Sequence, residues 1–234
     1  MIHLYQLPKF KDKEYSMSPF CLKLELYFKA MGIDYVNQFS LELSKSPTGK
    51  MPYIETQGKK YADSGLIIDM LESESGNYLD SHLSKEQKAQ AWAFIRMCED
   101  NIYWVGAYGR WIDSDNVPNW KSILQETVGM PKIMLNLLFP AMKRGVAKQL
   151  KGQGLLLLSK KEIYQKATKD IESIANFLNG RKYFFNGKLS LVDIVVFSML
   201  VMSANGSCGK RLLNIVKENN LENFIENINT KYFA

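Results

Sequence analysis

The sequence predicts a mixed α/β part followed by an all-α part. Up to about residue 80, short apolar runs bounded by proline, glycine and polar turns alternate with amphipathic stretches. Beyond about residue 85 the strand signals vanish, and apolar residues recur every three or four positions. We therefore expect an N-terminal α/β domain over residues 1–80 and a C-terminal helical domain over residues 86–234.

The first strand and helix are predicted over residues 2–7 and from Ser18 to Gly32. Proline ends the strand, a polar loop follows, and Ser18 has the residue type of an N-cap with Pro19 at the first helical position. Glu25 and Lys29 lie four residues apart, off the apolar stripe, so we expect them on the exposed face as an ion pair. The stripe itself consists of Cys21, Leu24, Phe28 and Met31.

A second strand over residues 33–39, a hairpin and a further helix complete the first part. Pro52 stands at the entry of the first hairpin strand, one of the few places where a sheet admits proline. Gly58 marks the turn, and Asp63-Ser64 opens the helix. The order βαβ and then ββα predicts a mixed four-stranded sheet with helices packed on it.

The second part is predicted to contain only helices. A long one covers residues 85–111, another residues 161–179, and an apolar one residues 194–204. Ser190 and Asp193 form a capping box that opens the apolar helix, which is a structural role. One or two more helices are expected over residues 210–233.

Composition limits the function classes. With 46% hydrophobic and 23% charged residues, the chain of 234 residues reads as globular and soluble. The net charge is +6, but the 30 basic residues are spread along the chain and mixed with 24 acidic ones. No nucleic-acid-binding motif accompanies them, so we expect no nucleic-acid binding. No apolar run is long enough to span a bilayer. Three scattered cysteines and two histidines predict no metal site and a cytoplasmic location.

The segment Ser18-Pro19-Phe20-Cys21 is the candidate reactive site. A helix N-terminus offers unpaired N–H groups and a positive dipole end, which favour an anionic sulfur. The spacing is that of C-x-x-C with serine in place of the first cysteine. Each residue also has a structural interpretation: Ser18 as a plain helix cap, and Cys21 as a small core residue.

Ser-Pro-Phe-Cys at the first helix, Met51-Pro52 before a hairpin strand, Asp63-Ser64 at a helix start and the all-α part together resemble the glutathione transferase superfamily. Residues 18–25 and 103–111 are most similar to the branch of metaxins and failed-axon-connections proteins. The resemblance implies a thioredoxin-like N-terminal domain, glutathione as co-substrate without a metal, and a homodimer.

The resemblance also implies a glutathione site. Pro52 would be a cis-proline that leaves the Met51 backbone free to pair with glutathione. Asp63 and Ser64 would hold the γ-glutamyl end, and Lys50 would be a further contact. A plain helix cap is the alternative for Asp63-Ser64.

Ser18 is the predicted catalytic residue, because its hydroxyl can donate to the glutathione thiolate and lower the pKa of that thiol. Cys21 and Tyr5 are the alternatives. The predicted pocket for a hydrophobic co-substrate consists of Tyr103, Trp104, Tyr108 and Trp111, with core packing as the alternative for these aromatics. Arg110 on the same helix could meet an anionic group.

Three functions follow. The first is a transferase that conjugates glutathione to a small hydrophobic electrophile, as in detoxification. The second is a non-catalytic docking protein, in which the apolar residues 133–139 and the basic stretch from Lys143 to Lys151 face a partner or a membrane surface. The third is a glutathione-dependent thiol reductase that uses Cys21.

Overall fold

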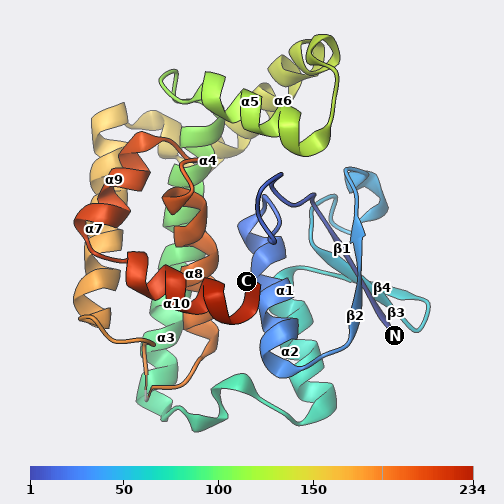
Figure 1. Cartoon of the computed structure of the whole chain (residues 1–234), viewed down its shortest axis with the longest axis vertical. Coiled ribbons are helices and arrows are strands. Elements are labelled where there is room, and N and C mark those ends of the chain that lie inside the picture. Colours follow the sequence, from blue (N-terminus) through green and yellow to red (C-terminus); the bar gives the residue numbers. More distant parts are fainter. Residues whose placement is uncertain (186, 234) are drawn as a thin grey trace.

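The computed structural model describes residues 1–185 and 187–233. It contains the predicted sheet with its helices and, beside them, a larger helical part (Figure 1). The first part consists of β1 (Ile2–Gln6), α1 (Pro19–Met31), β2 (Tyr35–Phe39), β3 (Tyr53–Thr56), β4 (Lys59–Ala62) and α2 (Ser64–Ser75). The second consists of α3 (Lys85–Met97), α4 (Tyr103–Trp111), α5 (Val117–Val128), α6 (Lys132–Gln153), α7 (Lys160–Leu178), α8 (Leu191–Ala204), α9 (Lys210–Glu218) and α10 (Glu222–Phe233). The predicted fold class is confirmed.

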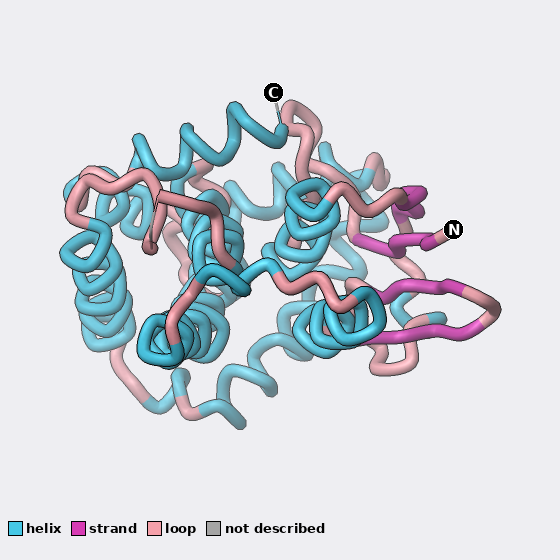
Figure 2. The backbone as a smooth tube through the Cα atoms, turned by 90° about the horizontal axis from the view of Figure 1, so that it is seen from below, coloured by secondary structure: helices cyan, strands magenta, loops and turns pink. Residues whose placement is uncertain are grey.

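The sheet has the strand order β2-β1-β3-β4 and lies at one side of the molecule, as Figure 2 shows. Strands β1 and β2 are parallel, whereas β1–β3 and β3–β4 are antiparallel. Leu4 pairs with Ile54, and both are fully buried on the face that α1 covers. The next pair, Tyr5 and Tyr53, points to the opposite face because side chains alternate along a strand.

Helix α1 is the centre of the fold, and the prediction that Glu25 is exposed is wrong. The Glu25 side chain is 1% exposed. Its carboxylate accepts hydrogen bonds from Gln6 Nε2 at 3.0 Å, Tyr35 OH at 3.2 Å and Asn37 Nδ2 at 3.0 Å. The reason is that Glu25 faces β1 and β2, which supply these donors, while α8 and α2 pack on other sides of α1 and leave it no broad solvent face. Lys29 instead donates to the Tyr232 carbonyl at 2.7 Å.

The predicted helix over residues 85–111 is interrupted by a π-helical turn. Helix α3 continues through Cys98–Ile102 in π geometry into α4. A π turn adds a residue and rotates everything after it around the helix axis. The apolar stripe nevertheless continues through this turn, because Ala91, Ile95, Cys98, Ile102 and Val105 are all buried.

Helices α5 and α6 form a hairpin that projects from one end of the molecule (Figure 1). Aromatic rings attach it to α4: the Trp111 ring centroid is 5.7 Å from that of Trp120 on α5 and 5.3 Å from that of Phe139 on α6. Pro140 lies within α6, where it removes one backbone donor.

The capping box at the start of α8 is present as predicted and is fully buried. Asp193 Oδ1 accepts from the Phe184 N–H at 2.8 Å, and Oδ2 accepts from the Ser190 N–H at 2.8 Å. The carboxylate therefore ties the loop before α8 to the first turn of this central helix.

Asp193 should make stability depend on pH. Burial raises the pKa of this carboxyl to about 6, although its hydrogen bonds oppose the shift. In the unfolded chain the pKa is about 3.9. The folded state thus holds the proton more tightly, so this contribution is complete below about pH 4 and is lost by about 3 kcal/mol as the pH rises through 6.

The measurement is urea unfolding from pH 4 to pH 7, for the natural chain and for Asp193→Asn, which cannot titrate there. The difference between the two free energies of unfolding should change with pH in this window. The free energy of unfolding of the natural chain should fall, relative to that of Asp193→Asn, as the pH rises. A difference that is constant over the window would contradict the assignment.

Candidate functional site

Three predicted segments meet at one end of the sheet. Because β1 and β3 are antiparallel, as are β3 and β4, the end of β1, the start of β3 and the end of β4 lie side by side, where Tyr5 pairs with Tyr53 and Tyr53 with Ala62. The loop to Ser18 leaves from the first of these ends. Met51-Pro52 leads into the second, and Asp63-Ser64 follows the third.

Ser18 is the N-cap of α1 and is half-buried. Its Oγ accepts from the Cys21 N–H at 3.4 Å, and its own N–H donates to Ser16 Oγ at 3.3 Å. Ser16 in turn donates to the Leu7 carbonyl at 2.8 Å, which fixes the loop against the end of β1. A hydroxyl has one donor and two acceptor positions. Capping therefore leaves the Ser18 proton available for a ligand.

The two alternatives to Ser18 lie in less suitable places. Cys21 is completely buried, and burial raises the pKa of its thiol to about 11, with the Ser18 and Ser16 hydroxyls opposing the shift. A buried thiol with this pKa supplies almost no thiolate at neutral pH. The ring of Tyr5 stacks on that of Tyr53 at 4.4 Å, on the sheet face opposite to α1.

Met51 and Pro52 have the predicted backbone. The bond between them is cis, Pro52 is buried, and Met51 is half-buried in front of β3. Within residues 1–185 and 187–233, no hydrogen bond occupies the Met51 backbone N–H or carbonyl. Lys50 is exposed beside them. The segment therefore offers an unpaired backbone edge next to the start of α1.

Asp63 caps α2, and Ser64 is buried behind it. Asp63 Oδ1 accepts from the Gly65 N–H at 2.9 Å and the Leu66 N–H at 3.1 Å. Asp63 has φ +73° and ψ 116°, a combination that is rare for a residue with a side chain and is concentrated at functional sites. The predicted cap is thus present, while the exposed side of this carboxylate remains open to a ligand.

Lys23 is a residue at this end of the sheet that the sequence analysis missed. Its side chain is 3% exposed, and its Nζ lies 2.7 Å from Glu99 Oε1 in the π-helical turn. The same Nζ is 3.8 Å from the position that a Cβ on Gly65 would occupy. It therefore places an ammonium group beside the first turn of α2. The signal in the sequence was a lysine without a partner inside the apolar run of residues 19–28.

The predicted aromatic pocket is formed only in part. Tyr103 and Trp111 line a cavity of about 70 Å³ together with Pro19, whereas Trp104 and Tyr108 do not. Trp104 packs against Tyr103 at 5.0 Å between ring centroids, and Tyr108 packs against Tyr164 at 6.0 Å. The cavity is lined instead by Ile102 at the end of the π-helical turn and by the α4 residues Tyr103, Gly106, Ala107, Arg110 and Trp111. Tyr108 lies on the buried side of α4, so the spacing of the aromatics alone does not identify the stripe that lines the cavity.

Arg110 already has acceptors from the protein. Its Nη1 donates to the Met17 carbonyl at 2.9 Å and its Nη2 to Ser207 Oγ at 2.7 Å. The guanidinium lies 4.5 Å from the centroid of the Trp120 ring. Arg110 thus connects Met17, the residue before Ser18, to the helical part. Because the protein supplies these acceptors, Arg110 does not need the predicted anion to keep its position.

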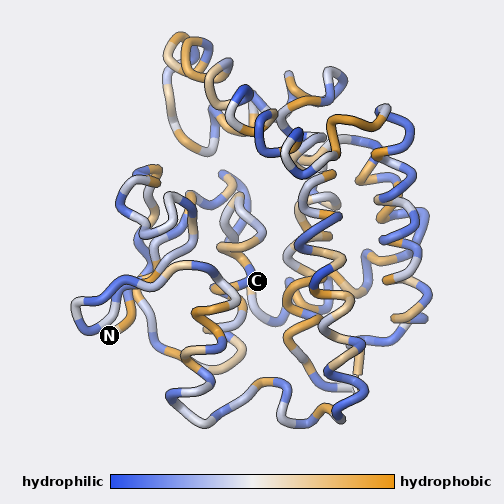
Figure 3. The backbone as a smooth tube through the Cα atoms, turned by 180° about the vertical axis from the view of Figure 1, so that it is seen from behind, coloured by the Kyte–Doolittle hydropathy of each residue, from blue (hydrophilic) through white to orange (hydrophobic). Residues whose placement is uncertain are grey.

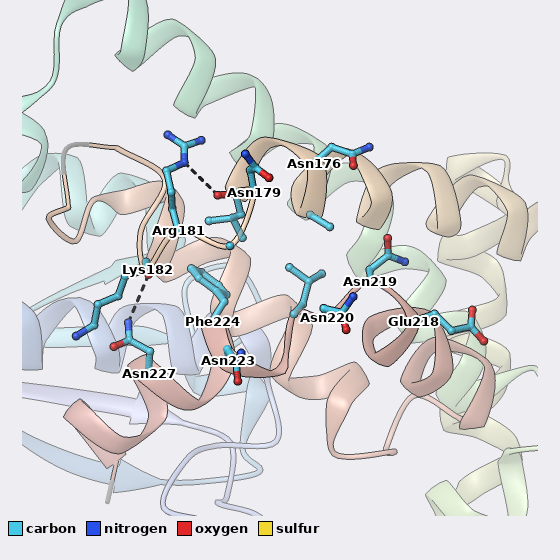
Figure 4. A pocket seen from close by; sticks show the side chains of 14 residues that line it. Asn176, Asn179, Arg181, Lys182, Glu218, Asn219, Asn220, Asn223, Phe224 and Asn227 are labelled. Carbon is cyan, nitrogen blue, oxygen red and sulfur yellow. Dashed lines mark hydrogen bonds between the residues drawn. The ribbon is translucent and has the colours of Figure 1, made fainter.

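A cavity of about 500 Å³ lies far along the helical part and contains none of the predicted site residues. Asparagines from α7, α10 and the turn after α9 dominate its lining, as Figure 4 shows. Asn227 Nδ2 donates to the Lys182 carbonyl at 3.4 Å, so part of this lining is occupied by its own backbone. The described residues include no group of three or more side chains suited to hold a metal ion. In the same part of the chain, no helix is long and apolar enough to cross a membrane.

Two family models match the chain. One is described as the glutathione S-transferase N-terminal domain and matches residues 19–116; the other is the glutathione S-transferase C-terminal domain and matches residues 167–228. Solved structures agree with the fold. The chain superposes on the β-etherase LigF from Sphingobium sp. strain SYK-6 with a TM-score of 0.67 at 16% identity, over 97% of this chain and 94% of that one. A glutathione transferase family member from Pseudomonas fluorescens pf-5, crystallised with two glutathione molecules, gives a TM-score of 0.56 at 16% identity, over 100% and 93% of the chains.

Among three relatives of the chain, one has a name that states an enzyme activity. Failed axon connections from Drosophila melanogaster is 33% identical over 86% of this chain. Isoprene-epoxide glutathione S-transferase from Rhodococcus sp. (strain AD45) is 32% identical over 79% of each chain. Metaxin-1 from Sus scrofa is 28% identical over 81% of this chain and 62% of its own. The chain spans about half the length of Failed axon connections, 49%.

Proposed function

The chain belongs to the glutathione transferase superfamily, in the branch with Failed axon connections and metaxin, and from this premise we propose that it binds glutathione and joins its sulfur to a small electrophile. The observation that supports the proposal best is the meeting of three groups at one end of the sheet. These groups are the Ser18 hydroxyl, the unpaired Met51 backbone and the first turn of α2.

Each group has a chemical role in the proposal. The Met51 backbone pairs with the cysteinyl part of glutathione in the manner of an added strand. The start of α2, with Ser64, binds the γ-glutamyl carboxylate, and the open side of Asp63 pairs with the ammonium group. Ser18 donates its proton to the glutathione sulfur, and the dipole of α1 further favours the anion. Both effects lower the pKa of the bound thiol below about 8.5, and the thiolate is the form that attacks.

The cavity beside Pro19 supports a small co-substrate. Its volume of about 70 Å³ is far below the 300–1,000 Å³ that is usual for a drug-sized ligand. The name of one relative, isoprene-epoxide glutathione S-transferase, states a small electrophile. The walls of Tyr103 and Trp111 are apolar. The proposal therefore specifies an electrophile of only a few heavy atoms, and it includes a cytoplasmic location and a homodimer.

Docking without catalysis is the second candidate, and the small size of the cavity is the observation that favours it. A thiol reductase that uses Cys21 has no such support, because this thiol is buried and its pKa is raised. Retention of the full chain on immobilised glutathione, followed by conjugation assays with small epoxides and an aryl halide, separates the first two candidates. A chain that is not retained would overturn the proposed function, and retention without turnover would favour docking.

Ser18→Ala should lower turnover roughly 100-fold, because one preorganised donor to a developing or bound anion contributes this much in other enzymes. The affinity for glutathione should change little, since its other contacts remain. The thiolate absorbance of bound glutathione, titrated against pH, should move toward the value of the free thiol.

Ser18→Thr is the matched variant, because it keeps both the cap and the hydroxyl. It should retain most of the activity and of the pKa shift, whereas the cap lost in Ser18→Ala costs about 1 kcal/mol of stability. Equal thiol pKa values in the alanine variant and in the natural chain would remove Ser18 from the catalytic role.

A further inference from the structure

We infer that the outward face of α6 docks on an anionic lipid surface. The first half of this helix is apolar on the side that faces away from the protein. Ile133 is 85% exposed and Leu137 is 77% exposed, with Met134 at 50% and Leu138 at 42% beside them. Within α6 only Leu135, Phe139 and Leu150 are buried. Large aliphatic side chains exposed together on one surface mark an interaction site.

The second half of the same face is basic. Helix α6 contains five lysine and arginine residues and no acidic residue. Arg144, Lys148 and Lys151 follow Ile133 by 11, 15 and 18 residues, which are close to whole numbers of turns at 3.6 residues per turn. Apolar and basic side chains therefore succeed one another along a single outward stripe.

The succession of exposed apolar and then basic side chains along α6 fits a membrane surface. Aliphatic side chains enter the boundary between head groups and acyl chains, while cations beside them are attracted by anionic head groups. The hairpin projects from the molecule (Figure 1), and Figure 3 shows hydrophobic residues at the end where it lies. Helix α6 is not apolar enough to cross the membrane, so it would lie on it.

The hairpin lies outside the parts of the chain that the family models match. These end at residue 116 and resume at residue 167, whereas α5 begins at Val117 and α6 ends at Gln153. The surface uses none of the residues placed in the proposed glutathione site, so the inference does not depend on that chemistry.

Sedimentation of the full chain with vesicles tests the inference. Vesicles of phosphatidylcholine with phosphatidylserine should bind the chain, and pure phosphatidylcholine should bind it much more weakly. The double variant Ile133→Glu/Leu137→Glu should weaken binding at least roughly 10-fold through loss of the apolar contact. Arg144→Glu/Lys148→Glu/Lys151→Glu should weaken it roughly 100-fold, given about 1 kcal/mol for each cation near the surface.

The matched control is Leu41→Glu/Leu43→Glu, which also replaces two exposed leucines, at 47% and 44%, but on the loop beside the sheet. It should bind as the natural chain does. Thermal unfolding of every variant checks that the fold is kept. Absence of binding to anionic vesicles, or equal binding by all variants, would overturn the inference. It would also fail if the natural chain were a dimer that Ile133→Glu/Leu137→Glu converts to a monomer, because a second copy would then cover this face.

Discussion

Replacing Gly109 with alanine is expected to destabilise the fold by about 3 kcal/mol, the upper part of the usual range for overpacking. A Cβ on this residue of α4 would lie 2.2 Å from the Cys208 carbonyl oxygen, and that atom belongs to the backbone. Asn116 holds the two segments together, because its Nδ2 donates to the carbonyls of Gly109 at 3.0 Å and Ser207 at 3.1 Å. Helix propensity alone would favour alanine by about 1 kcal/mol, so the close contact decides the sign.

Urea unfolding of Gly109→Ala measures this effect, and Gly145→Ala is its control. Gly145 is also within a helix, but no atom lies within 4 Å of the position of its Cβ. The control should therefore gain up to about 1 kcal/mol from helix propensity. If both alanine variants were as stable as the natural chain, the close approach of α4 to the segment before α9 would be incorrect.

Replacing Glu25 with alanine is expected to cost about 4 kcal/mol, because it removes a buried carboxylate that accepts three hydrogen bonds. Tyr35 and Asn37 lose the acceptor of their hydrogen bonds, and Gln6 Nε2 keeps only its bond to Asn37 Oδ1 at 2.6 Å. Unsatisfied buried donors are expensive because neither water nor another residue replaces the missing oxygen. The loss acts on the site as well, because this carboxylate fixes α1, and with it Ser18, against β1 and β2.

Glu172→Ala is the control for this experiment. It also removes a glutamate from within a helix, but from the exposed side of α7. Its free energy of unfolding should stay within about 0.5 kcal/mol of the natural value. Glu25→Gln should lie between the two, since an amide keeps one acceptor oxygen and adds a donor where donors already point. An alanine variant at position 25 that is as stable as Glu172→Ala would contradict the role given to the network.

Local signals in the sequence predicted what depends on a few neighbouring residues. The cap at Ser18, the end of α1 at Gly32 and the capping box at Asp193 all occur where the residue types indicated, whereas the cis bond at Pro52 was expected from the family resemblance. Each requires only a short segment to adopt one conformation. The order of strands and helices follows from the same kind of signal.

What the sequence did not predict depends on which element covers which face. Glu25 and Lys23 have nothing in their local sequence that marks them as buried: β1 and β2 cover Glu25, and the π-helical turn covers Lys23. Trp104 packs against Tyr103, and Tyr108 packs against Tyr164 on α7, contacts that the spacing within α4 does not specify. Burial of a charge is a property of the distant segment that packs on it, and periodicity within one helix contains no information about that segment.

The position of Arg110 has a mechanical consequence. The Arg110 guanidinium donates hydrogen bonds to the Met17 carbonyl and to the Ser207 hydroxyl, and it lies over the Trp120 ring. A shift of the segment between α8 and α9 is therefore transmitted through a rigid planar group to the residue that precedes Ser18. The position of Ser18 therefore depends on residues almost two hundred positions away in the sequence. The helical part thus supports the backbone that carries Ser18, in addition to lining the cavity beside it.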